Sequence, residues 1–517
     1  MSRMMVNTVV LLAVLLAACA VPAAAAGEKD NGDDAADAAK YESSVVGLDV
    51  TYQLWDEDRP WAKRIPKHRK ATAVLVEGSY LLTTAQMVDQ ATFIRLATFG
   101  RTRPVEPRVV RVAPDINLAL LEIEDAATLE TLTPAPVAAG TPTAGVLRTV
   151  RWSGQQLEAS ASRVIGFRVE RSWGGRLDHA FLHMRTDMGS GGWGEPVFSD
   201  GELVGLTVSQ KQQRSRAIPA EVLNAFLEQA LAEGPMPGFP CMGISWQVNE
   251  DRALAAYLGQ QGEPRGVLIR EVPWGSSACG VLEPRDLLLE LGGHAIDAEG
   301  YYRHRQLGRL KLSHLVVEGY RPGDAVAARV LRGGEEIDVS ITLRPYPAAL
   351  DLVPARRDGP PPFVVAGGLV IRELDFPYLG TWGNDWDEAA PISLTTRYRM
   401  NRNGQSPERR RYVLVTQVLP VEYNVGYQAI RDAVIEEVNG RPIASIVDVV
   451  SALGEPRDGF HLIRLSPDSG REMVVLDAAG LDQATAEVME TYRVPEAVRL
   501  PPEPLPAGGG DCPGSDS

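Results

Sequence analysis

The sequence predicts a mainly β fold, with a double β-barrel followed by two smaller α+β domains. Apolar stretches that alternate with polar residues and end at turn residues fill the first half of the chain, which is typical of β-strands. A turn-plus-strand pattern then occurs twice in the second half, at residues 291–296 and 438–443. The chain has 517 residues, more than one hydrophobic core holds, and this length indicates about three domains.

The N-terminal residues 1–26 have the composition of a signal peptide. Arg3 supplies a positive charge, residues 6–18 form an apolar core that is short for a membrane-spanning helix, and small residues follow. The residues that end at Cys19 match the bacterial lipobox, in which the cysteine is lipidated, while the alanines at 24–26 offer an ordinary cleavage site. We therefore expect a protein exported to the periplasm or cell envelope, in contact with a membrane only if Cys19 carries a lipid.

Two segments are expected to be flexible. Residues 27–43 are acidic and poor in large apolar side chains, and residues 501–517 are rich in proline, glycine and small residues. Both barrels are expected within residues 44–234, closed by a helix over residues 220–232 whose leucine and phenylalanine side chains share one face. The expected strands lie at residues 45–54, 71–76 and 93–99 in the first barrel and at 145–150, 158–167 and 180–185 in the second.

Three motifs in this region carry the residues of a candidate catalytic site. An apolar strand runs into a Thr-Thr-Ala turn that is followed by Gln86. Asn117 directly precedes a second apolar run. The third motif is a glycine-rich loop that contains Ser190 and Trp193 and ends at Pro196. In order and spacing these motifs resemble the histidine, aspartate and serine positions of trypsin-like proteases of the HtrA/Deg family, which implies a double barrel of that type.

The resemblance also implies that the catalytic chemistry is missing. Gln86 stands where the family has its general base, and an amide has no useful proton affinity. Asn117 stands where an aspartate orients the imidazole and stabilises its cation. Counting back from Pro196 without a gap puts Trp193 at the nucleophile position, whereas a three-residue insertion would put Ser190 there. Neither alignment supplies a base, so the motifs indicate a pseudoprotease.

Residues 238–345 resemble a PDZ domain of the same family. A peptide binds to such a domain as an added strand, and consecutive backbone N–H groups in a glycine-containing loop receive its terminal carboxylate. The resemblance implies that Met242, Gly243 and Ile244 form this loop, since glycine lets the backbone approach closely. The opposite wall is expected from the helix that contains Leu315, with this side chain as a contact.

Residues 352–500 resemble the second, PDZ-like domain of long Deg proteases. A Gly-Gly pair at residues 367–368 opens this domain, and the pattern at residues 438–443 continues it. An apolar strand at residues 474–477 and a helix at residues 484–492 are expected to complete it.

Composition excludes several other functions. The formal net charge of -15 argues against binding to the phosphate backbone of nucleic acids, which relies on clustered lysine and arginine. The sequence contains no phosphate-binding glycine loop, His-Glu-x-x-His motif or calcium loop, and its cysteines lack the spacing of metal ligands. We therefore expect no cofactor and no metal.

The motifs together favour an exported, non-catalytic protein that binds peptide C-termini or unfolded polypeptides through PDZ domains, as an adaptor or scaffold in envelope protein quality control. The family resemblance implies a homotrimer. One alternative is a regulatory subunit that assembles with an active paralogue. Another is a divergent but active serine endopeptidase that uses Ser190.

Overall fold

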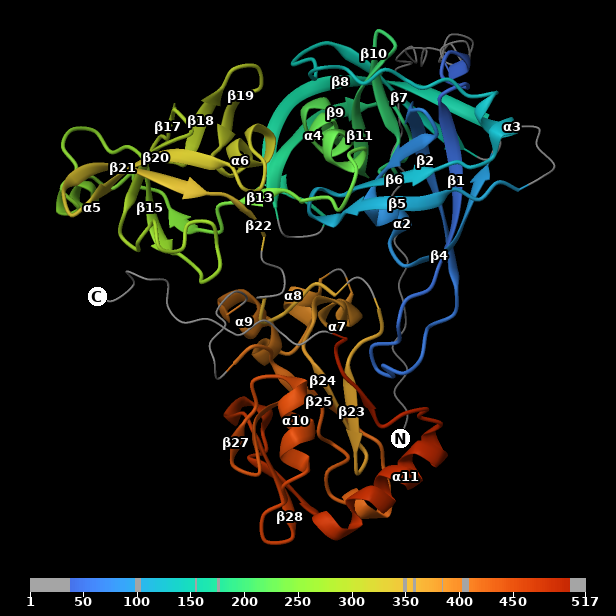
Figure 1. Cartoon of the computed structure of the whole chain (residues 1–517), viewed down its shortest axis with the longest axis vertical. Coiled ribbons are helices and arrows are strands. Elements are labelled where there is room, and N and C mark those ends of the chain that lie inside the picture. The colour runs from blue at the N-terminus through green and yellow to red at the C-terminus, as the bar shows by residue number, and fades with distance from the viewer. Residues whose placement is uncertain are drawn as a thin grey trace, which may run out of the picture.

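The computed structural model describes residues 38–97, 104–153, 156–173, 177–346, 351–356, 359–383, 385–401 and 409–502. It is mainly β, as predicted, and consists of a barrel domain (residues 38–234), a middle domain (238–346) and a C-terminal domain (351–500). Figure 1 shows the barrel and middle domains side by side, with the C-terminal domain below them. The predicted signal peptide with Cys19 and most of the predicted tail lie outside the described residues.

The first half of the barrel domain is a six-stranded antiparallel sheet in the order β4-β1-β2-β3-β6-β5. Alternate side chains point into its core, where Leu48, Leu75 and Leu121 are buried. Strand β2 begins before the predicted strand, because its polar first residues still pair with β1. The strands are β1 (Val45–Tyr52), β2 (Lys67–Glu77), β3 (Tyr80–Thr83), β4 (Ala91–Ala97), β5 (Arg108–Ala113) and β6 (Leu118–Glu122).

The second half is a closed barrel in the order β10-β11-β12-β9-β8-β7. The predicted closing helix is present as α4 (Ala220–Ala230), and its apolar face, which includes Leu223 and Phe226, is fully buried. The strands are β7 (Val146–Ser153), β8 (Gln156–Arg171), β9 (Asp178–Thr186), β10 (Pro196–Ser199), β11 (Glu202–Lys211) and β12 (Arg214–Pro219).

The described chain begins with residues that pack against the barrel domain. Ala38 and Tyr41 are buried, and the Tyr41 ring stacks on Phe198 with the ring centres 4.3 Å apart. Residues 38–43, which composition assigned to the flexible linker, are thus part of the packed chain. The linker prediction failed here because one aromatic side chain in a polar segment is enough to anchor it.

The middle domain contains a sheet in the order β14-β15-β16-β20-β21 and the helices α5 (Arg252–Tyr257) and α6 (Ser313–Gly319). Its buried side chains form one continuous cluster with those of the second barrel, so the two domains pack as one unit. The strands are β13 (Pro240–Cys241), β14 (Ser245–Gln247), β15 (Val267–Glu271), β16 (Leu287–Leu291), β17 (His294–Ala295), β18 (Tyr301–His304), β19 (Gly308–Lys311), β20 (Ala325–Arg332), β21 (Glu335–Thr342) and β22 (Arg344–Pro345).

A histidine cluster lies where β9 of the barrel domain meets α6 of the middle domain. The backbone N–H of Ala180 donates a 3.2 Å hydrogen bond to Nδ1 of His314. The Glu318 carboxylate lies 3.0 Å from Nε2 of His314 and 3.2 Å from Nε2 of His304. His179 is fully buried beside them, and this burial lowers its pKa to about 3. The cluster is therefore part of the domain interface.

The C-terminal domain is an antiparallel sheet in the order β29-β28-β26-β25-β24-β23-β30 with two helices packed on it, α10 (Ile446–Leu453) and α11 (Leu481–Tyr492). The predicted final strand and helix correspond to β29 and α11. Three short helices that the sequence analysis did not predict precede β25: α7 (Phe376–Leu379), α8 (Trp386–Ala389) and α9 (Ile392–Asn401). The strands are β23 (Phe363–Ala366), β24 (Leu369–Glu373), β25 (Val413–Val418), β26 (Ala433–Val438), β27 (Arg441–Pro442), β28 (Phe460–Leu465), β29 (Met473–Asp477) and β30 (Val498–Arg499).

In the part of the chain that the structure describes, no helix has the length and apolar character needed to cross a membrane.

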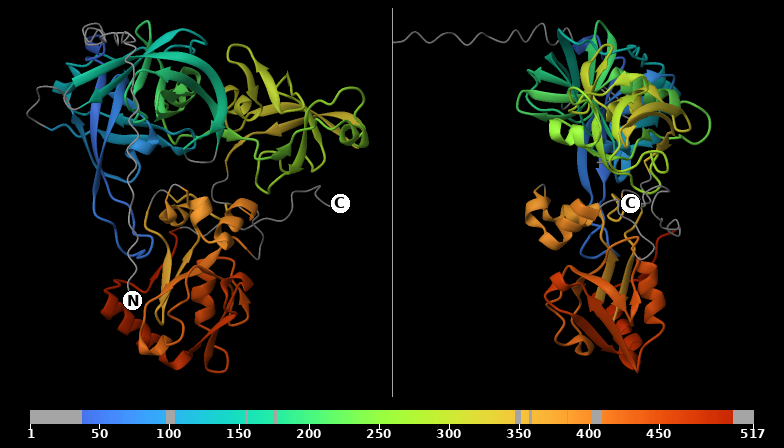
Figure 2. Two further views of the ribbon diagram at one scale, coloured as in Figure 1. Left: turned by 180° about the vertical axis from the view of Figure 1, so that it is seen from behind. Right: turned by 90° about the vertical axis from the view of Figure 1, so that its left-hand side faces the viewer.

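The long loop between β1 and β2 joins the barrel domain to the C-terminal domain. Figure 1 and Figure 2 show this loop descending to the C-terminal domain. Its Glu57 carboxylate pairs with Arg356 and with Arg372, each at 2.7 Å, and both guanidinium groups also contact Asp375, at 2.7 and 2.9 Å. Because Arg372 is almost fully buried, this network, which we call the Glu57 clasp, is a specific contact between the two domains.

Candidate functional site

Gln86 and Asn117 meet at one end of the first sheet. Gln86 lies in the short helix α2 (Ala85–Val88), and Asn117 follows η1 (Pro114–Ile116) in the left-handed conformation, with φ 61° and ψ 41°, which asparagine tolerates better than most residues. Oδ1 of Asn117 accepts a 2.9 Å hydrogen bond from the backbone N–H of Gln86, and the Asn117 carbonyl accepts one of 3.1 Å from Ala85. The residues at the predicted base and carboxylate positions are therefore neighbours.

The side chain of Gln86 ties the two halves of the barrel domain together. Its Nε2 group donates hydrogen bonds to the carbonyl of Gly192, at 3.2 Å, and to the carbonyl of Val208, at 2.9 Å. The backbone carbonyl of Gln86 in turn accepts a hydrogen bond from the Arg69 guanidinium. Both hydrogens of the amide are engaged, and an amide does not take a proton from a nucleophile. A structural contact thus fills the position where a protease needs its base.

The carboxylate of Glu195 occupies backbone donors of the glycine-rich loop. Its Oε2 accepts hydrogen bonds from the N–H groups of Gly192, at 2.9 Å, and Trp193, at 3.0 Å, and from the Thr207 hydroxyl. Burial raises the pKa of the Glu195 carboxyl, although these hydrogen bonds oppose the rise. In the proteases that this loop resembles, backbone N–H groups of the loop stabilise the oxyanion of the transition state. In this structure the Glu195 carboxylate therefore occupies the N–H groups of Gly192 and Trp193.

The two candidate nucleophile positions differ in their surroundings. Trp193 follows Gly192, whose carbonyl contacts Gln86, and its own carbonyl accepts a 2.9 Å hydrogen bond from the backbone N–H of Thr72. Ser190 is exposed, and its Oγ accepts a 2.9 Å hydrogen bond from the Arg151 guanidinium. No histidine of the described barrel-domain residues is hydrogen-bonded to Ser190. Trp193 thus follows the residue that contacts Gln86, whereas Ser190 is bonded to Arg151 at the rim of the loop.

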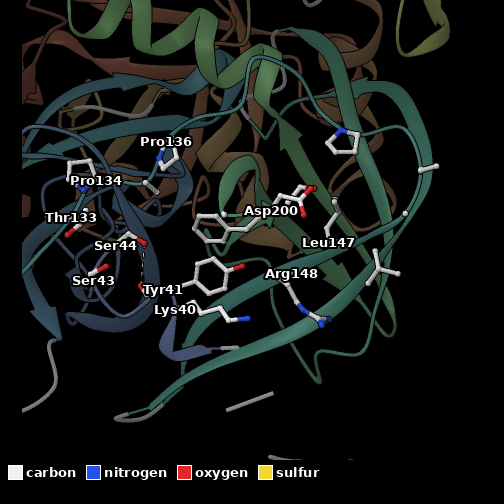
Figure 3. Close-up of a pocket in the computed structure, with 18 residues that line it drawn as sticks. Lys40, Tyr41, Ser43, Ser44, Thr133, Pro134, Pro136, Leu147, Arg148 and Asp200 are labelled. Atoms are coloured by element: carbon white, nitrogen blue, oxygen red, sulfur yellow. Dashed lines mark hydrogen bonds between the residues drawn. The ribbon is translucent and has the colours of Figure 1, made fainter. Parts of the chain in front are cut away.

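A cleft of about 970 Å³ opens beside these residues, between the two halves of the barrel domain. Ser190, Trp193 and Glu195 line this interbarrel cleft. A separate hollow of about 940 Å³ surrounds Tyr41 and is lined by none of the candidate catalytic residues (Figure 3). Among the residues that the structure describes, no group of three or more His, Cys, Asp or Glu side chains is placed to hold a metal ion.

The loop of Met242, Gly243 and Ile244 lines a groove of about 580 Å³ in the middle domain. Gly243 has a φ of 66°, and a Cβ at this position would lie 2.6 Å from the Cβ of Ser276, so the loop conformation requires glycine. Helix α6 forms a second wall of the groove, where Val316 lies. The loop and the helix are therefore arranged as a peptide-binding groove requires.

Leu315 does not line this groove, which corrects the sequence-based expectation. It is 6% exposed and points towards the turn at Gly292. Successive side chains of a helix diverge by about 100°, so a residue next to a groove residue faces elsewhere. The helix was predicted, but the face it presents was not.

Residues of both other domains complete the groove. Arg171 and Asp178 come from strands β8 and β9 of the barrel domain, and Tyr398 and Arg399 come from helix α9. The sequence analysis missed all four. They lie far along the chain from the glycine loop, so no local motif indicates them.

Two domains of the chain match known domain families. Residues 71–206 match the trypsin-like peptidase domain, and residues 353–498 match the PDZ domain. The chain is 24% identical over 466 residues to "Protease Do-like 2, chloroplastic" of Arabidopsis thaliana, which covers 88% of this chain and 75% of the relative. It is 27% identical over 325 residues to "Probable periplasmic serine endoprotease DegP-like" of Halomonas elongata, covering 58% of this chain and 61% of the relative. The solved structure "HtrA-type protease AlgW with decapeptide" is 19% identical, with a TM-score of 0.45, and covers 60% of this chain and 98% of that chain.

Proposed function

Since the chain carries a trypsin-like peptidase domain followed by a PDZ domain, as HtrA/Deg-type proteases do, we propose that it is a non-catalytic relative of these proteases that binds peptides. In this proposal the protein acts outside the cytoplasm. It captures peptide C-termini or unfolded polypeptides and serves protein quality control as an adaptor or scaffold, alone or in a mixed assembly with an active paralogue.

The observation that carries the proposal is the state of the loop around Trp193. Gln86 replaces a base and bonds two carbonyls, while the Glu195 carboxylate holds the N–H groups of Gly192 and Trp193. Hydrolysis needs a base, a nucleophile and free donors for the oxyanion, and the contribution of each is large. The base, the nucleophile and the free donors are thus all altered at this site.

The test of this proposal is a casein digestion assay combined with a fluorophosphonate probe on the purified protein. We expect neither turnover nor labelling, because no serine among the described residues is hydrogen-bonded to a histidine that could act as a base. Turnover that Ser190→Ala abolishes would instead establish the alternative, a divergent endopeptidase.

Peptide binding is tested on the full chain, because all three domains line the groove. We expect a peptide that ends in an apolar residue to bind saturably, and its C-terminal amide to bind more weakly, because the loop N–H groups then lose their anionic partner. Gly243→Val should weaken binding by crowding the loop. Gly262→Val is the matched control, since Gly262 also has a positive φ, of 83°, but has open space around it. If neither amidation of the peptide nor Gly243→Val weakens binding, the middle domain is a spacer.

Export and assembly are proposals of the same kind. Globomycin sensitivity that Cys19→Ser removes would support a lipid anchor, and unchanged processing of this variant would support ordinary cleavage near residue 26. Light scattering of the purified protein tests the homotrimer that the family resemblance implies.

A further inference from the structure

A basic ridge lies at the end of the β1–β2 loop and the start of β2. Four of its five basic side chains are exposed, in a chain whose formal net charge is -15. Within the described residues, none of the five forms an ion pair with a carboxylate. Such a concentration of like charge attracts anions to this part of the surface. The members of the basic ridge are Lys63, Arg64, Lys67, Arg69 and Lys70.

The ridge continues into the interbarrel cleft. Arg69 and Lys70 line the cleft together with Arg151 of β7, whose charge is partly offset by Glu158 at 2.7 Å. Among the described lining residues the only carboxyl group is that of Glu195, which is buried and has a raised pKa. Asp89 lies near Arg69 and Asp49 lies opposite Lys70, but neither carboxylate lines the cleft, so its lining residues carry more positive than negative charge.

Aromatic side chains also line the interbarrel cleft. Trp173 and Trp193 are 40% and 42% exposed, although tryptophan is mostly buried in folded proteins. Trp152 and Tyr52 line the same cleft, and the guanidinium of Arg69 lies 3.7 Å from the centre of the Tyr52 ring. This contact and hydrogen bonds to two backbone carbonyls hold the Arg69 side chain in place. Fixed cations and exposed indole rings thus share one concave surface.

We propose that the interbarrel cleft binds, without cleaving it, an acidic and unstructured peptide segment of another protein. Carboxylates of the segment would pair with Arg69, Lys70 and the outer lysines of the ridge, and its apolar side chains would pack on Trp173 and Trp193. The cleft volume of about 970 Å³ lies at the upper end of the roughly 300–1,000 Å³ that is usual for ligand pockets, which is sufficient for a short segment.

The shape and charge of this region favour a peptide over other anions. A membrane surface is flat and would reach the exposed ridge but would not enter the cleft that Trp173 and Trp193 line. A nucleic acid would make most of its contacts through many phosphates, whereas the described lining of the cleft offers three basic side chains, Arg69, Lys70 and Arg151. This site is separate from the groove of the middle domain, so it adds a second contact for an unfolded client to the proposed function.

The experiment is a fluorescence anisotropy titration of the full chain with a short peptide of alternating glutamate and phenylalanine. The peptide is amidated, so that it lacks the carboxylate that the middle-domain groove would receive. We expect saturable binding that weakens as salt is raised. Lys70→Glu should lower the affinity roughly five- to tenfold, mainly through slower association. Lys211→Glu is the matched control, because it makes the same charge change at an exposed position on β11 that does not line the cleft.

Trp173→Ala tests the aromatic wall and should also weaken binding. The proposal is overturned if the acidic peptide does not bind, if a lysine counterpart binds equally well, or if Lys70→Glu and Lys211→Glu behave alike. Binding of anionic vesicles that the peptide does not displace would also overturn it. Mass spectrometry of the peptide separates the two proposals, since cleavage contradicts both, whereas absence of binding leaves the non-catalytic function standing.

Discussion

Glu195 limits what a reversion of the catalytic positions can achieve. Its carboxylate holds the N–H group of Trp193, so a serine introduced there would attack a carbonyl whose developing charge lacks this backbone donor. Neighbouring residues that act as a unit contribute non-additively to catalysis. The residues of this loop therefore need to be changed together.

The first prediction concerns this dependence. The triple variant Gln86→His, Asn117→Asp and Trp193→Ser should show no casein turnover, because Glu195 still occupies the loop donors. Adding Glu195→Gly should raise the reaction with a fluorophosphonate by roughly 10²–10³-fold, the usual contribution of an oxyanion donor. Equal reactivity of the triple and quadruple variants would contradict this account, and the quadruple variant with alanine in place of serine at position 193 is the control.

Some of this site could be predicted from the sequence, and some could not. Gln86 and Asn117 each lie in a short motif, so their identities and their proximity follow from local patterns and the family resemblance. The role of Glu195 depends on Thr207, on a neighbouring strand, and on its burial by the surrounding fold. The Leu315 contact was wrong because the exact rotation of a short helix is set by packing rather than by its own sequence.

At the scale of elements, the contact between β9 and α6 should respond to pH. His179 has a pKa of about 3 in the folded chain because it is buried, whereas an unfolded histidine titrates near 6.5. Burial opposes the ionisation of Glu318, yet hydrogen bonds and charges from His314 and His304 lower its pKa overall. The unfolded chain thus binds more protons than the folded chain at acid pH. Both groups therefore make the fold less stable as the pH falls. The effect of His179 develops between pH 6.5 and about pH 3, and the effect of Glu318 develops below its unfolded pKa near 4.5.

The second prediction follows from this difference. At pH 5 the His179 ring should lower the free energy of unfolding by about 2 kcal/mol relative to neutral pH. His179→Asn keeps a nitrogen donor near the Ala180 carbonyl but does not titrate, so its urea unfolding midpoint should fall less between pH 7.5 and pH 5. His68→Asn, at an exposed position, should behave like the parent. Equal pH dependence of the His179 variant and the parent would exclude His179 as the titrating group.

Helices and strands whose side-chain period extends over many residues were predicted, and very short helices were not. The alternating strands of the barrel domain and the amphipathic helix α4 were found where expected, because their side-chain period is carried by many residues. Helices α7 (Phe376–Leu379) and α8 (Trp386–Ala389) are each one turn long, too short to show a helical period. Their packing against the rest of the C-terminal domain, rather than local preference, forms them.

For the whole molecule, the third prediction concerns the Glu57 clasp. Glu57→Ala leaves the buried guanidinium groups of Arg356 and Arg372 with a single carboxylate, and loss of a partner from such a buried pair costs about 3–5 kcal/mol. Its urea midpoint should drop, and small-angle X-ray scattering should show a larger maximum dimension as the domains separate. Glu202→Ala, at the exposed first position of β11, is the control. An unchanged dimension would mean that other contacts hold the domains.

The order of three domains could be predicted from length and motifs, but their arrangement could not. Glu57 and Arg372 lie in different domains, and each has an ordinary local sequence. Contacts of this kind arise only when separately folded surfaces meet, so no periodicity or spacing in the chain reports them.

Gln86 also bears on how such a barrel changes over evolutionary time. Any replacement of this residue first breaks the hydrogen bonds to Gly192 and Val208 that hold the two halves of the barrel domain together. A lineage in which another residue replaced Gln86 would lose stability at that step, whatever the protein does. The hydrogen bonds of Gln86 therefore let the demands of folding alone retain glutamine at this position, even without selection on function.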